Sequence, residues 1–408
     1  MLLTILNLLH KLKKCYNYMK SVVIFSMVDL YYGNSAAVVR MNNYARALAL
    51  ANVDVYLLSA LILDAKKEWI EVEPHIYTLP KGNAKSGKGY NPIYVTGLIL
   101  KIMKLMGTIR GNVVFFNYPS TSSLLLDIML LLFCKRFPIF CEVNEVRRYA
   151  SGSNNSIRNR AFWYVLEKTY KYYQGVVFIS RTIQEYYTSK VRKSLVVPIL
   201  SDCDNVFVPT KGIDTLDFVF VGTVSFSKEN LEELLKGFCL FVKEHPEARL
   251  KLYGILSSSD KKILDSFIEK NDIKEQILYL GKLQHSEVEK VLSTAGALLL
   301  SRSNNKQNYY GFSTKLSEYA VSGAPIIMTN TGIVADYFQD RVNCLMCDGY
   351  DRYAFDIKFK ELARMSVDEK QQMAKKAYLV AKSKFDYKLY SKPLKCFLFF
   401  EFEHEKTI

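Results

Sequence analysis

The chain has 408 residues, of which 50% are hydrophobic and 23% charged, a composition that can bury a core and excludes a disordered protein. The length suits two domains better than one, and eight scattered cysteines exclude a disulfide framework as the basis of so large a fold. The net charge of +15 lies wholly in residues 1–200, which hold 26 Lys and Arg but only 11 Asp and Glu. Residues 201–408 hold 29 residues of each sign and are neutral.

The first 18 residues are apolar and basic, and no small-residue cleavage site follows them, as a signal peptide would require. Two interpretations remain open: a basic amphipathic helix on the surface, or an over-long start with Met19 as the natural beginning. Both imply a cytoplasmic protein. The apolar run 124–133 is too short to cross a bilayer and is interrupted by Asp127.

Short apolar runs rich in β-branched residues alternate with amphipathic stretches of helical length along the chain. Strands are expected at residues 22–26, 53–59, 113–117, 139–143, 176–179 and 195–197, and, after Pro209, at 218–221, 250–253, 277–280, 297–300 and 326–328. Between them lie helical patterns such as Leu231, Leu234, Leu235 and Phe238, spaced i, i+3, i+4, i+7. Such alternation predicts parallel sheets covered by helices on both faces.

The two series of strands predict an α/β fold of two doubly wound, Rossmann-like domains that face a central cleft. Ligands of such sheets bind at the carboxyl ends of the strands. The expected divisions are a basic extension or over-long start at 1–18, a first Rossmann-like domain at 19–205, a second at 206–385, and a tail at 386–408 that packs back on the first domain.

The segment 309–330, YYGFSTKLSEYAVSGAPIIMTN, carries helix start and stop residues. Ser313 is a good N-cap, whereas Gly323 and Pro325 end a helix, so about three turns are expected from Thr314. The amides of Thr314 and Lys315 would then be free to meet an anion.

Glu318 lies about one turn further along this helix, roughly 6 Å at a rise of 1.5 Å per residue. A carboxylate there can accept hydrogen bonds from both ribose hydroxyls of a nucleotide, although a solvated surface glutamate fits the local pattern equally well.

Upstream, FVFVGTVSFSKENLEELL reads as a strand, a turn at Gly222, a loop that carries Lys228 and then a helix. Lys228 is placed where a loop at a strand end can reach phosphates.

Together these segments resemble the group 1 glycosyltransferases, a retaining family with the GT-B fold. The pieces follow the family order over most of residues 215–350: VGTVSFSKENLEELLKGF, LKLYG, ILYLGKLQHSEVEKVLSTAGALLLSR and GFSTKLSEYAVSGAPIIMTNTG. In the first half the likeness is looser, with YYGNSAAVVRMNNYARAL similar to the glycine loop and CEVNEVRR to the acceptor-side loop.

The resemblance implies that residues 19–205 are an acceptor-side domain and residues 206–385 a nucleotide-sugar-binding domain. It also implies a role for each residue of the donor site. Lys228 would hold the pyrophosphate, Glu318 the ribose, and the amides of Ser313 and Thr314 the phosphates. The remaining donor-site residues are Gly33, which lets the first-domain loop approach, Gly281 and Leu283, which cup the base, Arg302, which lines the cleft, and Gly311, Phe312 and Lys315 around the helix start. The family mechanism needs no metal and no cofactor besides the UDP- or GDP-sugar substrate.

Two positions depart from the family pattern. The family has a pair of glutamates with seven residues between them, and Tyr310 stands where the first is expected. Thr223 occupies a position where the family often has arginine. Tyr310 and Glu145 are the candidate catalytic residues; Glu145, at a strand end on the acceptor side, would position the acceptor, or else form a salt bridge with Arg147 or Arg148.

The sequence therefore predicts a retaining, metal-independent glycosyltransferase that acts on a glycan or lipid-linked acceptor in surface polysaccharide or glycoconjugate synthesis. The basic first half predicts peripheral contact with an anionic membrane at its inner face. The five histidines lack metal-ligand spacing, and the basic patches lack a nucleic-acid-binding motif. The alternatives are a catalytically inactive GT-B binding subunit, which Tyr310 supports, and a GT-B sugar-nucleotide epimerase.

Overall fold

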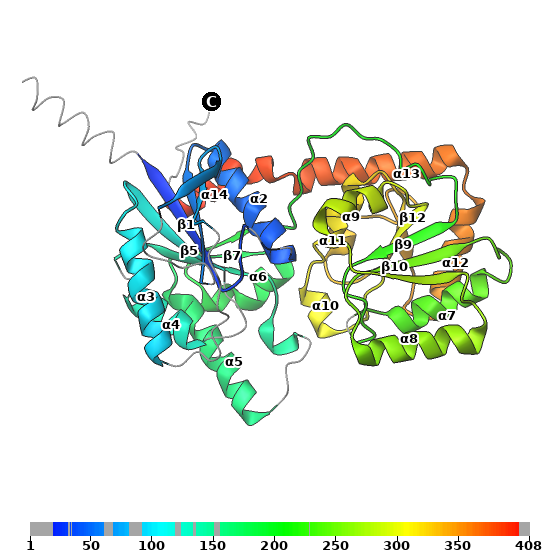
Figure 1. Cartoon of the computed structure of the whole chain (residues 1–408), viewed down its shortest axis with the longest axis horizontal. Helices are drawn as coiled ribbons and strands as arrows, with labels where there is room; N and C mark the ends of the chain where they lie inside the picture. The colour runs from blue at the N-terminus through cyan, green and yellow to red at the C-terminus, as the bar shows by residue number, and fades with distance from the viewer. Residues whose placement is uncertain are drawn as a thin grey trace, which may run out of the picture. The chain divides into compact units, whose positions relative to one another are not determined.

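The computed structural model describes residues 19–399 apart from 32, 34, 61–67, 81–91, 119–123, 134–135, 151–155 and 228. The chain divides into two compact units. The first comprises residues 1–148, 153–197 and 387–408, and the second residues 149–152 and 198–386. Each unit is built on a sheet of its own (Figure 1).

The first unit contains an eight-stranded sheet in the order β3-β4-β2-β1-β5-β6-β7-β8. Neighbouring strands are parallel except for β3 and β4, which are antiparallel. The strands are β1 (Lys20–Ser26), β2 (Asp54–Ser59), β3 (Ile70–Glu73), β4 (Ile76–Thr78), β5 (Asn112–Tyr118), β6 (Ile139–Val143), β7 (Gly175–Phe178) and β8 (Ser194–Val196). Both β1 and β6 are buried almost throughout, as a parallel sheet covered on both faces requires.

The helices of the first unit are α2 (Ala36–Leu50), α3 (Pro92–Met106), α4 (Leu124–Phe133), α5 (Ile157–Thr169), α6 (Arg181–Tyr187) and, from the C-terminal end of the chain, α14 (Ser391–Phe399). Helix α14 packs against α2 (Figure 1). The Phe397 ring lies 5.4 Å from that of Phe140 in β6, and Lys193 Nζ donates a hydrogen bond of 2.6 Å to the Phe397 carbonyl. These contacts fasten the end of the described chain to the first sheet.

A buried ion pair ties α2 to the middle of this sheet. The guanidinium of Arg40 on α2 pairs with the carboxylate of Glu142 on β6, and both side chains are almost fully buried. Arg40 Nη2 also donates to the Tyr44 hydroxyl at 2.9 Å and to the Val197 carbonyl at 2.8 Å. Burial raises the pKa of Glu142 and Arg40 opposes that rise, so the charges compensate each other in a place without water.

The second unit contains a six-stranded sheet in the order β11-β10-β9-β12-β13-β14, and all its pairs are parallel. Its strands are β9 (Asp217–Val221), β10 (Arg249–Tyr253), β11 (Ile277–Gly281), β12 (Ala297–Leu300), β13 (Ile326–Thr329) and β14 (Leu345–Cys347). Its helices are α7 (Leu231–Phe241), α8 (Ser258–Asn271), α9 (His285–Leu292), α10 (Lys306–Tyr310), α11 (Lys315–Val321), α12 (Arg352–Arg364) and α13 (Val367–Val380).

Aromatic side chains fill the interface between α7, α12 and the second sheet. The Phe218 ring of β9 lies 5.7 Å from Phe241 of α7 and 4.8 Å from Phe359 of α12, both edge to face. Helices α7 and α12 lie directly side by side (Figure 1). A side chain at Gly237 would place its Cβ 2.6 Å from the Arg352 carbonyl oxygen, so glycine permits this close packing.

The predicted α/β fold with parallel sheets in two domains is confirmed. The apolar stripe 231–238 is buried on α7 as its spacing predicts. Three short strands were not predicted: β3, β4 and β14, which have three or four residues each. The helix expected from Thr314 over about three turns is wrong in length, because α11 has only seven residues, Lys315–Val321. Gly323, with φ of +86°, follows its C-cap as predicted.

Candidate functional site

Charged side chains converge where two strands of the second unit end and a helix begins. Strand β9 ends at Val221 and β12 ends at Leu300, two residues before Arg302, and α11 begins at Lys315. The carboxyl ends of parallel strands share one edge of the sheet, which is where doubly wound folds bind ligands. Within this edge the structure brings together Arg302, Lys315 and a carboxylate that the sequence did not single out, Glu229.

Glu229 is the centre of this cluster. Its side chain is 1% exposed, and its Oε1 lies 3.1 Å from Lys315 Nζ. Its Oε2 lies 3.3 Å from Arg302 Nε, an ion pair without hydrogen-bond geometry. The backbones of Glu229 and Arg302 also form an isolated antiparallel bridge. One buried carboxylate thus holds two cations whose side chains remain 14% and 15% exposed.

Arg302 connects the cluster to the approach of α11. Its Nη2 donates to Ser313 Oγ at 2.9 Å, and its Nη1 donates to Asn308 Oδ1 at 3.4 Å. The prediction that Ser313 caps the helix is therefore wrong: Thr314 occupies the N-cap position, and no side chain caps it. The hydroxyl of Ser313 accepts a hydrogen bond from Arg302 because the loop before α11 faces the end of β12.

Lys315 is held against the end of β9. Its ammonium lies 3.9 Å from the centre of the Phe220 ring, within cation–π range. A Cβ at Gly222 would lie 2.2 Å from Lys315 Cε, and Gly222 has a φ of +144°, which L side chains rarely adopt. Glycine at the turn after β9 is therefore required both by the backbone and by the position of this lysine.

Replacing Gly222 with alanine is expected to displace Lys315 from Glu229 and to strain the backbone. We expect a loss of about 1–3 kcal/mol in the free energy of unfolding, since residues forced into such conformations cost this much. Urea unfolding of Gly222→Ala and Gly281→Ala measures the effect. Gly281 also has a positive φ, +77°, but open space surrounds its Cβ, so its variant reports strain without the clash. An equal loss in both variants would contradict a role for the Lys315 contact.

Glu318 lies one turn beyond Lys315 on α11. Burial raises the pKa of its carboxyl to about 7, and the nearby Lys315 charge opposes part of that rise. Among the described residues, none donates a hydrogen bond to this carboxylate. A largely desolvated carboxylate without a partner is costly to the fold, and such groups gather at functional sites.

Three other predicted donor residues of the second unit lie around this edge of its sheet. Gly281 ends β11 and is followed closely by Leu283, which is half-buried. Gly311 follows α10, where a Cβ would lie 2.9 Å from the Gln307 carbonyl oxygen. Lys228, predicted to hold the pyrophosphate, lies outside the described residues.

Phe312 faces the core. Its ring stacks on that of Tyr337, with centres 5.4 Å apart, and lies edge to face with Phe385 at 5.8 Å. The side chain is buried. Only the backbone of Phe312 is therefore left to serve the predicted donor contact.

The two candidate catalytic residues have aromatic or ionic partners. The Tyr310 ring stacks on that of Tyr149, which belongs to the second unit, with centres 5.6 Å apart, and burial raises the pKa of its hydroxyl. In the first unit, Glu145 Oε1 accepts a hydrogen bond of 2.6 Å from Arg147 Nη1. The ion pair that the sequence left open for Glu145 is thus present with Arg147.

The backbone of the first unit requires glycine at position 33. A Cβ at this position would lie 2.5 Å from the Asp29 carbonyl oxygen and 3.0 Å from Val38 Cγ2. The turn before α2 therefore excludes any side chain here, whether or not a ligand approaches.

The part of the chain that the structure describes holds no group of three or more His, Cys, Asp or Glu side chains placed to share a metal ion. Within the same residues, no helix combines the length and the apolar character needed to span a membrane. The positive charges of the second-unit cluster come from Arg302 and Lys315.

Comparison with known proteins assigns the second unit. Residues 206–380 match the sequence model of the family described as glycosyl transferases group 1. This match contains the whole cluster of Glu229, Arg302, Lys315 and Glu318. No sequence among the curated proteins is similar enough to count as a relative.

Solved structures resemble the whole chain. Sucrose-phosphate synthase from Thermosynechococcus elongatus matches with a TM-score of 0.68 at 12% identity, covering 92% of this chain and 97% of its own. HepE of Anabaena in complex with UDP-glucose matches with a TM-score of 0.67 at 11% identity, covering 92% and 98%. The α,α-trehalose 6-phosphate synthase from Burkholderia multivorans gives 0.65 at 11%, covering 93% and 98%. Residues 206–380 therefore match the group 1 glycosyl transferase family, and the chain as a whole has the GT-B fold.

Proposed function

We propose that this protein is a retaining glycosyltransferase that moves a sugar from a UDP- or GDP-sugar to a glycan or lipid-linked acceptor in surface polysaccharide or glycoconjugate synthesis. The observation that carries the proposal is Glu318, a carboxylate with a raised pKa and no hydrogen-bond donor among the described residues, one helical turn from Lys315 in the domain that matches the family. The complexes of HepE with UDP and UDP-glucose support the class of donor.

In this proposal, Glu318 accepts hydrogen bonds from the ribose hydroxyls of the donor. Those hydroxyls supply the partners that the carboxylate lacks in the described residues, so binding favours its ionised form. Lys315 and Arg302 face the diphosphate, where negative charge develops as the nucleotide leaves. Glu229 cancels one of the two positive charges and holds both cations in place before the donor arrives. Lys228 would add a further cation from the preceding loop.

Retention of configuration and independence of metal are also part of the proposal. The cations of the second unit supply the charge stabilisation that a metal gives elsewhere. The acceptor hydroxyl attacks on the face from which the nucleotide leaves. Glu145, already oriented by Arg147, is our candidate for positioning that hydroxyl. Tyr310 takes the place of the family's first glutamate, so its hydroxyl and the neighbouring backbone would make the sugar contacts.

One observation favours a second function, a binding subunit without catalytic activity. Tyr310 stacks on Tyr149 and cannot supply the carboxylate that the family places near the sugar. Such a subunit would retain nucleotide binding through Glu318 and would lack turnover.

A turnover assay separates the two functions. Wild-type protein and Glu318→Ala are incubated with UDP- and GDP-sugars, and release of the nucleoside diphosphate is measured. We expect wild type to hydrolyse at least one donor slowly without an acceptor, and Glu318→Ala to be about 100-fold slower, as the loss of about 2.7 kcal/mol of transition-state binding implies. Nucleotide binding without turnover of any donor would support the binding subunit instead.

The first unit has a proposed location as well. Since the excess of 15 positive charges lies in residues 1–200, we propose that this unit holds the protein at the inner face of an anionic membrane. The attraction between exposed charges and such a surface is screened within roughly 8 Å at physiological salt, so it should weaken as salt is added.

A further inference from the structure

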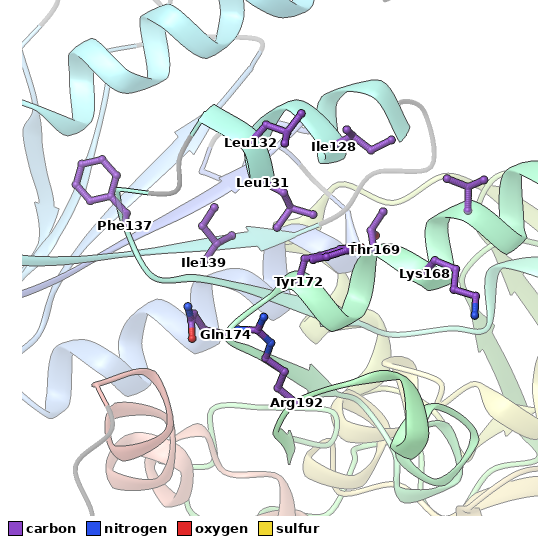
Figure 2. Close-up of a pocket in the computed structure, with 11 residues that line it drawn as sticks. Ile128, Leu131, Leu132, Phe137, Ile139, Lys168, Thr169, Tyr172, Gln174 and Arg192 are labelled. Carbon is purple, nitrogen blue, oxygen red and sulfur yellow. The ribbon is translucent and has the colours of Figure 1, made fainter.

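A cavity of about 640 Å³ opens in the first unit. It lies between α4, α5 and the start of β6, and its volume falls within the range of small-molecule sites, about 300–1,000 Å³. Figure 2 shows the side chains of Ile128, Leu131 and Leu132 from α4 on one side of the cavity, and those of Thr169 from α5 and the following Tyr172 on the other. Neither the fold nor the proposed transferase chemistry accounts for it.

The walls of this cavity are apolar, and they continue onto the surface. Leu132 and Tyr172 line it and are 56% and 57% exposed. Val165 also lines it and is exposed on α5. Monomeric proteins seldom leave contiguous apolar side chains in water, and where they do the patch is commonly a binding surface.

Two cations lie on the margin of the cavity. Lys168 follows Val165 by one turn of α5, so these two side chains share one helical face. Arg192, just before β8, lines the cavity from a second segment (Figure 2). Both side chains are exposed, and Lys168 Nζ lies 5.2 Å from the centre of the Tyr164 ring. Among the described residues that line the cavity, none is a carboxylate.

An apolar cavity with a cationic margin fits an amphiphile whose tail is hydrocarbon and whose head is an anion. We propose that the α4–α5 cavity binds one acyl chain of an anionic membrane lipid, with Lys168 and Arg192 against the headgroup phosphate. Residues 1–18 are apolar too, but they carry three lysines and no acidic residue, so the same two cations would repel them. The proposal rests on the membrane part of the proposed function and is independent of the transferase chemistry.

The experiment is co-sedimentation of the full chain with vesicles of phosphatidylglycerol or of phosphatidylcholine at low salt. We expect binding to phosphatidylglycerol alone, with Leu132→Glu weakening it at least tenfold. Its matched control is Leu100→Glu on α3, a leucine that is 61% exposed and outside the cavity. A second comparison uses two double variants. One carries Lys168→Glu and Arg192→Glu at the cavity, and its control carries Lys101→Glu and Lys104→Glu on α3. Both double variants change the charge of the first unit equally. The control variants should weaken binding much less than the cavity variants do.

The proposal is overturned if wild type ignores both vesicles, or if the cavity variants and their controls weaken binding equally. If residues 1–18 alone carry the binding, Leu132→Glu will bind vesicles as tightly as wild type does, and this result would also overturn the proposal. Because Leu132 is exposed, its variant should fold, which urea unfolding of the full chain checks; binding of UDP or GDP is measured in the same samples. If wild type fails to bind lipid but binds UDP or GDP, the cavity proposal fails and the proposed transferase stands. If wild type binds lipid but neither nucleotide, the proposed transferase fails and the cavity proposal stands.

Discussion

Replacing Glu318 with glutamine is expected to stabilise the empty protein above pH 7 and to weaken donor binding at the same pH. The folded pKa of Glu318, about 7, lies above the ordinary value of 4.5, so ionisation of this carboxyl destabilises the fold as pH rises from 4.5 to 7. Glutamine removes that cost. The difference between the ordinary pKa of 4.5 and the folded pKa of about 7 sets an upper bound of about 3 kcal/mol on the gain. At pH 4.5 or below, the two proteins should be equally stable.

Donor binding should respond to pH in the opposite sense. If ribose hydroxyls donate to the ionised carboxylate, affinity falls about tenfold for each pH unit below 7 in wild type and is independent of pH in Glu318→Gln. Urea unfolding and donor titration at pH 5, 6, 7 and 8 measure both effects. The control is Glu289→Gln, which changes an exposed glutamate on α9 of the same unit. A Glu318→Gln variant that is both less stable and unaltered in donor binding would assign this carboxylate a structural role only.

Removing the Glu229 carboxylate should be the most damaging substitution in the second unit. In Glu229→Ala, Arg302 and Lys315 keep their charges but lose the buried group that pairs with both. Breaking a buried ion pair by removing one partner costs about 3–5 kcal/mol, and we expect the lower end because both cations keep some exposure. Nucleotide affinity should fall as well, since the two cations are no longer held in place.

Two variants sharpen this test. Glu229→Gln keeps the shape of the side chain and should recover part of the stability but not the ion pairs. Asp265→Ala removes the partner of Lys261 in an exposed pair on α8, whose side chains are 58% and 55% exposed, and should cost less than about 1 kcal/mol. Urea unfolding of the three variants gives the comparison. A Glu229→Ala loss as small as that of Asp265→Ala would contradict the central position of Glu229.

The fold was predictable because its determinants are local. The β9 and β12 runs are short, apolar and bounded by polar turns, and the apolar spacing on α7 points directly to its buried face. Strand β14 was not predicted because three residues are too few to show a periodic pattern. Its strand conformation is set by its pairing with β13. Ser313 does not cap α11 because its hydroxyl accepts a hydrogen bond from Arg302, 11 positions earlier in the sequence, and no local capping preference reports such a contact.

The candidate site was predictable only where a motif marks it. Lys315 and Glu318 were found from the helix start and the spacing along the helix, and the family resemblance added Arg302. Glu229 was missed because it stands in KENLEE, an acidic stretch that looks like the solvated first turn of a helix. Its burial depends on the backbone bridge to Arg302, more than 70 residues away, and no local pattern reports such a contact. The same holds for Arg40 and Glu142, whose pairing joins residues separated by 102 positions.

The central claim is that the second unit binds the nucleoside diphosphate of a sugar donor through Arg302, Lys315 and Glu318. Calorimetric titration of the wild-type full chain with UDP and with GDP at pH 8 tests it most directly. We predict that one of the two binds at a single site with a dissociation constant below about 1 mM, which corresponds to a binding free energy stronger than about −4 kcal/mol. Absence of saturable binding for both nucleotides would contradict the claim.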